Sequence, residues 1–520
     1  MNHLVIAPIL LPLIAGILHL LGRHFPHYWR RTFSYAVVSA QIGLAVALLL
    51  AVSDGSILTY ALGNWPAPFG IVLVADRLSV WMLLITAVLA LFPLIYASQG
   101  RGNPVAVDVS GRHFHILYQL QLMGLNGAFL TGDLFNLFVF FEVLLLASYG
   151  LILHGGNRLR TKAGLHYVVL NLAGSALFLI AVGTLYGLLG TLNMADLALK
   201  MAAVTPENLG PARAAGLLLF AVFALKAALL PLYLWLPAAY AQTSAPVAAL
   251  FAIMTKVGAY SILRVSTLIF GAQAGAMSEL IEPWLLPLAL ATLLIGMFGA
   301  LAARQLREQI AYLVVASVGT LLTAFSLGSI AGIAAGLYYL PHSVFSAATF
   351  FLLADRIVHS RQQNQDQIGD LYQPAPAMAN AALLGGLFFI AAILVAGLPP
   401  LSGFVGKFLL LRAALAHPQL AWIMPLVLIG GLFALIALAR AGSLLFFRVL
   451  PPTETDSAST DATAPTASAQ WPLLLPIIAL LALCLGLTLA AGPIHAYALA
   501  TAEQLLQPYH YVHAVLGGRP

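Results

Sequence analysis

The chain has 520 residues, of which 61% are hydrophobic and only 8% are charged. An average soluble domain carries roughly 25% charged residues, so this composition largely excludes soluble enzymes and nucleic-acid binders and indicates an integral membrane protein. The formal net charge of +6 fits basic cytoplasmic loops better than an anionic partner.

Apolar stretches long enough to cross a bilayer recur along the whole chain. A core of about 30 Å needs roughly 20 helical residues. We therefore predict an all-α integral membrane protein with 14 transmembrane helices and a single membrane domain over residues 1–520. The predicted spans are 4–21, 33–53, 77–97, 114–131, 134–154, 165–189, 214–235, 245–267, 283–303, 309–328, 331–354, 381–414, 421–447 and 472–493.

The N-terminal region, residues 1–113, holds the first three predicted spans. No Lys or Arg precedes the apolar run 4–21, which makes a poor signal-peptide n-region. We expect this run to be retained as the first span.

Four ionisable side chains stand out because they lie deep inside predicted spans, where a charge costs about 2.5–3.5 kcal/mol at mid-bilayer. They are Glu142, Lys226, Lys256 and Lys407. Each of these residues also has a purely structural explanation. The glutamate could be protonated or lie near the membrane interface. The lysines could extend their ammonium groups to the interface or flank a span. If the glutamate instead pairs with a lysine, each keeps the other charged, and a proton that enters nearby breaks the pair. This arrangement predicts a proton relay.

Polar side chains also share one face of two predicted spans. The first stripe comprises Tyr167, Asn171 and Ser175. The second comprises Tyr338, His342, Ser346 and Thr349. Either stripe could simply join helices by hydrogen bonds. An imidazole suits proton transfer near neutral pH, so His342 favours the relay for the second stripe.

Prolines interrupt two of the spans close to these lysines. Pro231 follows Lys226 by five residues, and Pro399 and Pro400 precede Lys407. Proline opens the helical hydrogen-bond ladder, and open backbone at membrane depth is tolerated where it lines a cavity or is buried in protein. Breaks at corresponding places in two blocks predict inverted five-helix repeats, here helices 4–8 (residues 114–267) and 9–13 (residues 283–447), with helices 7 and 12 broken.

The C-terminal part holds a polar segment and a last span. Residues 451–470 are rich in Ala, Thr and Pro and predict a flexible cytoplasmic loop before helix 14 at 472–493. The only cysteine is Cys484, which excludes an internal disulfide framework, a zinc site of cysteines and Cys-ligated iron–sulfur clusters. We expect no metal site and no cofactor.

The basic residues are divided unevenly between the predicted loops. When basic residues near the ends of spans are assigned to the adjoining loop, 14 of the 23 Lys and Arg residues belong to odd-numbered loops, six to the other loops and the C-terminal tail, and three lie deep inside spans. The positive-inside rule places the odd-numbered loops in the cytoplasm and both termini outside.

Three long segments carry a resemblance to a known family. They read FLTGDLFNLFVFFEVLLLASYGLI, ALKAALLPLYLWLPAAYAQTSAPVAALFAIMTKVGAYSILR and AGLPPLSGFVGKFLLL. In sequence and order they resemble the antiporter-like subunits shared by the Mrp-type multisubunit cation/proton antiporters and respiratory complex I. GNWPAPFGIVLVADRLS makes the chain most similar to the D-type branch of the Mrp subunits, in its proteobacterial form.

The resemblance implies 14 spans, two inverted repeats and broken helices 7 and 12. It also implies a bacterial cytoplasmic (inner) membrane location with both termini periplasmic, and a relay along the membrane midplane. The helix 5 glutamate and helix 7 lysine of the family fall on Glu142 and Lys226. Its bridging lysine, terminal lysine and helix 11 histidine fall on Lys256, Lys407 and His342.

Two positions depart from the family pattern. Many relatives have a lysine where this chain has Ser346, and many have a histidine where it has Tyr233. The central route is therefore expected to depend more on water and hydroxyl groups.

The leading hypothesis is a proton/cation-translocating subunit of a multisubunit Na⁺/H⁺ antiporter. Its expected partners are the other subunits, H⁺, Na⁺ or another monovalent cation, and membrane lipid, with no nucleic acid. The alternative is a proton-pumping membrane subunit of a complex I-like or membrane-bound hydrogenase complex, which the neighbouring genes would distinguish. A stand-alone solute carrier is less favoured, because we expect no arginine at mid-membrane depth to anchor a carboxylate or sugar. The sequence leaves the cation itself open.

Overall fold

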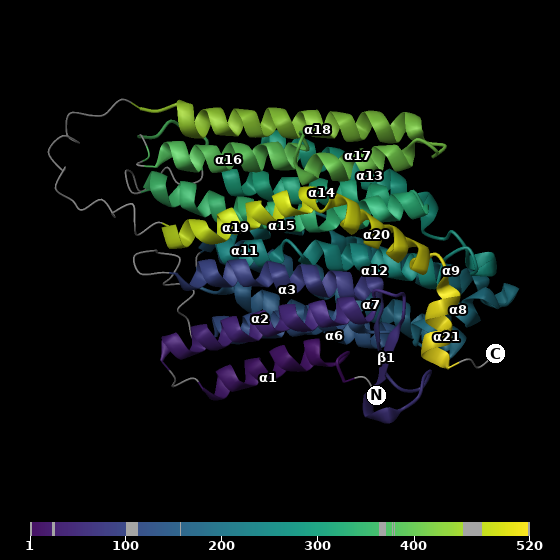
Figure 1. Ribbon diagram of the computed structural model, residues 1–520. Helices are drawn as coiled ribbons and strands as arrows, with labels where there is room; N and C mark the ends of the chain where they lie inside the picture. Colours follow the sequence, from purple (N-terminus) through teal and green to yellow (C-terminus); the bar gives the residue numbers. More distant parts are fainter. Residues whose placement is uncertain are drawn as a thin grey trace.

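The helices of the computed structural model run side by side as one elongated bundle (Figure 1). The structure describes residues 3–22, 26–99, 113–156, 158–362, 371–376, 378, 380–450 and 471–517. The predicted loop at 451–470 lies outside the described residues. Both chain termini lie at the bundle end that carries β1, α8 and α21 (Figure 1).

The N-terminal region combines helices with a short hairpin. Its elements are α1 (Ala7–Leu21), α2 (His27–Ala51), β1 (Leu58–Ala61), η1 (Leu62–Asn64), β2 (Val72–Ala75) and α3 (Arg77–Ser98). The two strands pair antiparallel, with Leu58 opposite Ala75 and Ala61 opposite Val72. The hairpin was not predicted, because strands of four residues give no signal at the length of a membrane span.

The middle of the chain is entirely helical in its described elements. These are α5 (Phe114–Leu130), α6 (Leu134–Leu153), α7 (Arg158–Leu189), α8 (Met194–Ala202), α9 (Pro206–Ala227), α10 (Trp235–Gln242), α11 (Ala245–Phe251), α12 (Met254–Leu268) and the 3₁₀ turn η2 (Gly275–Met277).

The last part of the chain is helical as well. Its elements are α13 (Glu282–Ala302), α14 (Leu306–Phe325), α15 (Ile330–Gln362), α16 (Ala381–Ala396), α17 (Ser402–Ala414), α18 (Leu420–Gly442), the π-helical turn η3 (Ser443–Phe447), α19 (Trp471–Leu489), α20 (Ala491–Leu505) and α21 (Pro508–Leu516).

Eleven helices of the described chain are long and apolar enough to cross a membrane, counting α11 with α12 as one. Two shorter apolar helices, Ala7–Leu21 and Ala381–Ala396, accompany them. The chain is therefore a mostly helical membrane protein, as its composition indicates. The count of fourteen spans stays a prediction.

Helical structure is interrupted at three places inside the spans of the two predicted repeats. Helix α9 ends at Ala227 and α10 begins at Trp235, with Pro231 between them. Helix α16 ends before Gly397, whose φ of 80° only glycine adopts readily, and Pro399 and Pro400 precede α17. The boundary predicted at residue 235 was wrong, because α10 continues to Gln242. A third break separates α11 from α12, where no proline or glycine marks it in the sequence.

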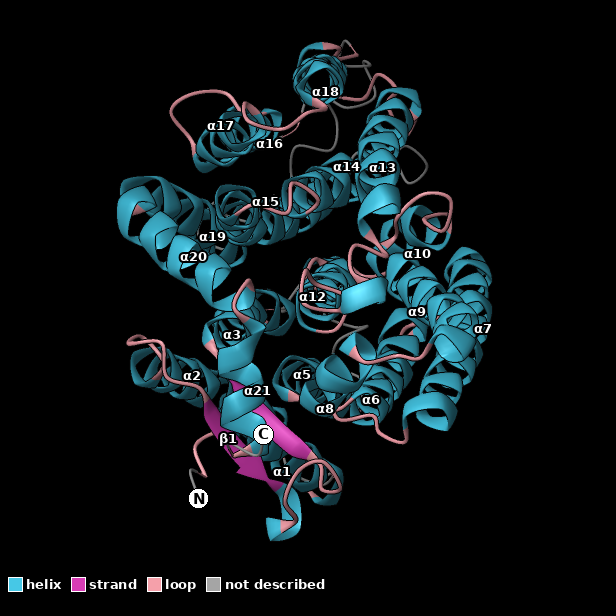
Figure 2. Cartoon of the chain, turned by 90° about the vertical axis from the view of Figure 1, so that its right-hand side faces the viewer, coloured by secondary structure: helices cyan, strands magenta, loops and turns pink. Residues whose placement is uncertain are grey.

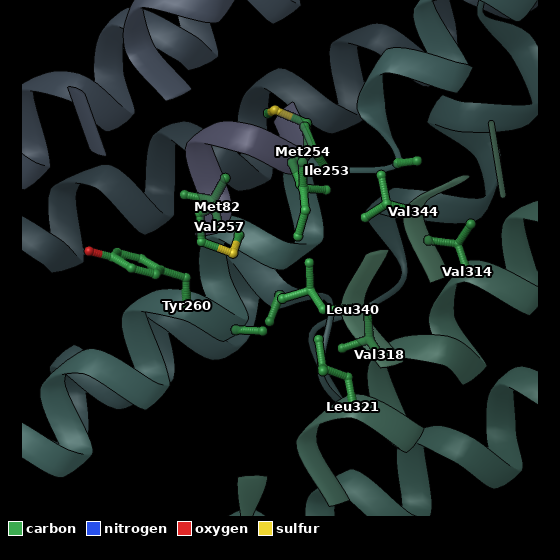
Figure 3. Packing of buried hydrophobic residues seen from close by; sticks show 14 of the residues in the cluster. Met82, Ile253, Met254, Val257, Tyr260, Val314, Val318, Leu321, Leu340 and Val344 are labelled. Atoms are coloured by element: carbon green, nitrogen blue, oxygen red, sulfur yellow. The ribbon is translucent and has the colours of Figure 1, made fainter. Parts of the chain in front are cut away.

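The most deeply buried helices lie in the interior of the array, as the end-on view shows for α12 and α15 (Figure 2). Both are buried along their most apolar stretches, whereas only 28% of the residues in the apolar stretch of the α18 span are buried. Side chains of α3, α12, α14 and α15 interlock there, among them Met82, Val257, Val318 and Leu340 (Figure 3). A polar group on these helices must therefore find its partners inside the protein or in bound water.

Candidate functional site

The first polar group joins α6, α7 and α9. The Ser175 hydroxyl on α7 donates a hydrogen bond to the Glu142 carboxylate on α6. One turn earlier on α7, the Asn171 side-chain oxygen accepts a hydrogen bond of 3.2 Å from the Lys226 ammonium on α9, and its backbone carbonyl lies 3.4 Å from the same nitrogen. The ion pairs found between described residues do not include one between Glu142 and Lys226. The two charges are thus linked through Ser175 and Asn171.

The local sequence explains this arrangement. Tyr167, Asn171 and Ser175 recur at helical spacing and lie on the buried face of α7. Lys226 stands in the last turn of α9, where unpaired carbonyls and the negative end of the helix dipole favour a cation. The same lysine is 8% exposed, so snorkelling to the surface does not explain it.

A small cavity adjoins this group. Its volume is about 10 Å³, and Tyr167, Asn171, Lys226 and Trp235 are among its lining residues. A space of this size holds at most one water. The Tyr167 hydroxyl lies 2.9 Å from that of Ser148, which extends the polar group toward one end of α7.

Helix α12 crosses α9 very closely at Lys226. A Cβ atom added to Gly258 would lie 2.7 Å from the Lys226 carbonyl carbon and would also overlap the backbone nitrogen of Ala227. Only glycine permits this approach. Lys256, two residues earlier on α12, is fully buried, so the crossing brings the segments that carry the two lysines together.

Lys256 connects to the second half of the molecule through hydroxyl groups. Its ammonium donates a 3.2 Å hydrogen bond to Ser317 on α14, and Ser343 on α15 donates a 3.1 Å bond to the same oxygen. Sequence reasoning missed both serines. They could have been found as hydroxyls in apolar spans, but single serines are common there and nothing sets these apart.

A larger cavity separates Ser317 from the terminal lysine. Its volume is about 30 Å³, and Ser317, His342, Ser343, Ser346 and Lys407 are among the residues that line it. This is room for about two waters. The cavity therefore joins residues of α14, α15 and α17 in one polar compartment.

The interrupted helix α16–α17 positions the last two predicted relay residues, His342 and Lys407. The His342 ring lies 3.0 Å from the Ser402 hydroxyl at the start of α17. The Lys407 ammonium donates hydrogen bonds to the carbonyls of Ala396 (2.8 Å) and Val395 (3.4 Å) at the end of α16. The Lys407 ammonium thus lies at the C-terminal end of α16, the preceding half-helix, whereas Lys226 stands in the last turn of its own helix, α9.

Not every residue of the predicted stripes joins these groups. The Tyr338 hydroxyl points to α19, where it donates to the Leu487 carbonyl, and Thr349 bonds within its own helix. Tyr233 lines neither of the two cavities. Of the second stripe, His342 and Ser346 face the larger cavity. Among the described residues, no cluster of three or more His, Cys, Asp or Glu could hold a metal ion.

Comparison with known families matches residues 131–434 to the model described as "NADH:quinone oxidoreductase/Mrp antiporter, TM". The matched segment includes Glu142, Lys226, Lys256, His342 and Lys407.

Full-length relatives and a solved structure agree with this match. The chain is 42% identical to a protein of Rhizobium meliloti named as the probable D subunit of a K(+)/H(+) antiporter, over 99% of this chain and 98% of the relative. It is 37% identical to the D subunit of a Na(+)/H(+) antiporter of Alkalihalophilus pseudofirmus, over 99% and 100%. A chain of the Mrp complex from Dietzia sp. DQ12-45-1b superimposes with a TM-score of 0.85 at 29% identity, over 99% and 100% of the two chains.

Proposed function

Because this chain belongs to the NADH:quinone oxidoreductase/Mrp antiporter family, we propose that it is the proton- and cation-translocating D-type component of a multisubunit antiporter. It is a transporter subunit rather than an enzyme, and it works within a hetero-oligomeric Mrp complex. The two full-length relatives are named for K⁺/H⁺ and for Na⁺/H⁺ exchange, so both cations are candidates here.

We propose that the chain spans the bacterial inner membrane with 14 helices and both termini in the periplasm. Three helices (1–113) precede two inverted repeats (114–267 and 283–447), which are followed by a cytoplasmic loop (451–470) and a last helix (472–493). The position of both termini at one bundle end supports this topology (Figure 1). The interruptions of α9–α10 and α16–α17 support the repeats.

In the first half of the proposed relay, the charges of Glu142 and Lys226 are coupled through the hydrogen bonds of Ser175 and Asn171. A proton that neutralises Glu142 removes the negative charge that helps to hold Lys226 charged. Lys226 then releases its proton toward α12. Tyr167 is hydrogen-bonded to Ser148 and extends this series of hydrogen bonds beyond Asn171.

In the second half, the proton moves from Lys256 to the larger cavity through hydroxyls. Ser317 accepts from Lys256 and also from Ser343, and both serines line the cavity with Lys407. His342 and Ser346 lie on the same wall. Water in the cavity completes the path where many relatives have a lysine in place of Ser346.

The membrane potential drives the exchange. It supplies about 2.3 kcal/mol for each charge that crosses 100 mV. Protons that enter along the relay can therefore expel cations when the two movements are coupled in the complex.

The observation that carries this proposal is the buried chain of hydrogen bonds around Lys226. Its test is Lys226→Arg in the assembled complex, measured as Na⁺- and K⁺-dependent proton exchange in everted vesicles. We expect exchange to be abolished, because arginine keeps its charge but cannot release a proton near neutral pH. The control is Lys200→Arg on the surface of α8, where Asp196 pairs with the lysine. Wild-type exchange by the Lys226 variant would remove this residue from the proton path.

The second candidate is a pumping subunit of a redox complex, which the family description also covers. The full-length identity to the D components of antiporters favours exchange over redox pumping. Proton movement that required an electron donor and a quinone would favour the redox complex instead.

A further inference from the structure

A large groove opens between α1 and α2, far from the proposed relay. Its volume is about 660 Å³, and its lining includes Leu18, His19, Leu21, Trp29, Arg30 and Phe33. Binding sites for organic ligands typically measure roughly 300–1,000 Å³. The groove lies at the bundle end opposite the two termini, where α1 ends and α2 begins (Figure 1).

The floor of the groove is a fixed polar group. The His19 ring on α1 lies 2.9 Å from the Ser34 hydroxyl on α2, which lies 2.9 Å from the His115 ring on α5. The two imidazoles also stack at 5.4 Å. This network joins α1, α2 and α5, so side-chain contacts hold the wall of the groove in place.

The rim of the groove is basic and aromatic. Arg30 is half-buried in the lining of the groove, and its positive charge interacts electrostatically with the His19 imidazole. No Asp or Glu occurs in the first 53 residues, which makes this part of the chain basic overall. Trp29 is 64% exposed beside Arg30, as expected for an aromatic residue at the level of lipid headgroups.

We propose that this groove binds an anionic phospholipid of the cytoplasmic leaflet. One acyl chain lies along Leu18, Leu21 and Phe33, and the headgroup phosphate pairs with Arg30. Basic pockets between transmembrane helices on the cytoplasmic side recognise anionic headgroups in this way. The positive-inside rule places this end of the bundle at that leaflet.

The test uses the assembled complex in phosphatidylcholine vesicles that contain a trace of photoreactive lipid. One preparation carries a diazirine-labelled phosphatidylglycerol and the other carries the matching phosphatidylcholine. Labelled peptides from residues 18–33 are measured by mass spectrometry. One arginine contributes about 1 kcal/mol to binding an anionic surface, so we expect phosphatidylglycerol to label this segment about fivefold more than phosphatidylcholine.

Arg30→Gln should abolish this preference. The matched control is Arg31→Gln, because Arg31 donates to the Ser98 carbonyl and lies over the Tyr35 ring, outside the groove. Leu18→Trp should narrow the groove along the acyl-chain path and lower labelling by both probes. Equal labelling of the wild type by the two lipids would overturn the proposal.

Two further results would also overturn it: a preference that survives Arg30→Gln, and wild-type labelling no higher than that of Leu18→Trp. The second result is expected if a neighbouring subunit covers the groove. If the complex with Arg30→Gln does not assemble, competition with unlabelled lipid in the wild-type complex tests the same proposal. Unlabelled phosphatidylglycerol should then displace the probe, whereas phosphatidylcholine should not.

Discussion

At the scale of single residues, the Asn171 amide carries the contact between Glu142 and Lys226. Asn171 receives the Lys226 ammonium on its side-chain oxygen and donates from its amide nitrogen to the Tyr167 carbonyl. Its backbone carbonyl accepts from Ser175, which in turn binds Glu142. One residue therefore sets both the position of the lysine and the geometry of the serine.

Asn171→Leu should uncouple Glu142 from Lys226. The substitution keeps the side-chain size but removes a hydrogen bond to a charged group, which is worth about 1.5–3 kcal/mol. We expect exchange in everted vesicles to fall tenfold or more while the complex still assembles. Thr184→Ala, on the exposed face of the same helix, should leave exchange unchanged. Normal exchange by Asn171→Leu would show that the amide is only a packing contact.

A second residue-scale prediction concerns a buried ion pair outside the relay. Asp76 precedes α3 and pairs with Arg264 at 2.6 Å, and it also accepts from Ser79. Burial raises the pKa of the Asp76 carboxyl, but the Arg264 guanidinium and the Ser79 hydrogen bonds outweigh it and hold that pKa below its ordinary value. The pair therefore stabilises the fold above about pH 4, and this contribution is lost as the pH falls through the lowered pKa.

Asp76→Asn should destabilise the protein by about 3–5 kcal/mol, because it leaves Arg264 buried without its counter-charge. Thermal unfolding of the purified complex at neutral pH measures this loss. Asp54→Asn is the control, since Asp54 is exposed and accepts only a local hydrogen bond from Ser56. An Asp76→Asn complex as stable as the wild type would mean that water solvates the Arg264 guanidinium.

The sequence identified the charged members of the candidate site and the stripe with Asn171 and Ser175, but not the hydroxyls that link Lys256 to the larger cavity. Glu142 and Lys226 are conspicuous because a charge is costly in a span. Ser317 and Ser343 are inconspicuous because serine costs little there and commonly bonds to its own helix. Their importance arises only from the packing of α14 against α12 and α15, which one sequence does not reveal.

At the scale of elements, the proposed relay depends on how closely helices approach. Hydropathy predicted the long helices well, because each buries or exposes an apolar length that matches the bilayer. It missed the hairpin and the break between α11 and α12, which depend on tertiary contacts. The β2 strand, for example, is bound to the Gly132 backbone between α5 and α6.

Gly258→Ala should separate α9 from α12. The added methyl group would overlap the backbone at Lys226 and Ala227, so one helix must move. Overpacking of this kind costs about 1–3 kcal/mol, and we expect exchange to fall more than assembly. Gly183→Ala on α7 is the matched control, since nothing lies within 4 Å of its added methyl. Equal effects of the two substitutions would contradict the close crossing.

At the scale of the whole molecule, the two halves of the relay meet in the buried interior. Lys256 of α12 reaches α14 through one serine, so the proposed repeats are joined by a side-chain contact as well as by the chain. The family, the membrane location and the helical architecture were predictable from the sequence, because composition and long motifs specify them. The cavities were not, since their volumes depend on side chains from several helices.

The topology gives a prediction at this scale. A reporter fused after Arg160, at the start of α7, should read as cytoplasmic, and one fused after Pro520 should read as periplasmic. The physical reason is the excess of basic residues in the odd-numbered loops. Paired alkaline phosphatase and fluorescent-protein fusions in cells measure both positions. A cytoplasmic C-terminus would contradict the count of fourteen spans.

The complete burial of α15 has a consequence for how the protein is made. This helix is among the least apolar of the spanning candidates, because its surface faces protein rather than lipid. It contacts α17, α19 and α20, all of which are synthesised after it. During translation α15 therefore leaves the translocon before most of its permanent neighbours exist. Nascent chains that stop before α19 should then be held by an insertase or degraded by membrane proteases, and biogenesis should be complete only when the C-terminal helices arrive.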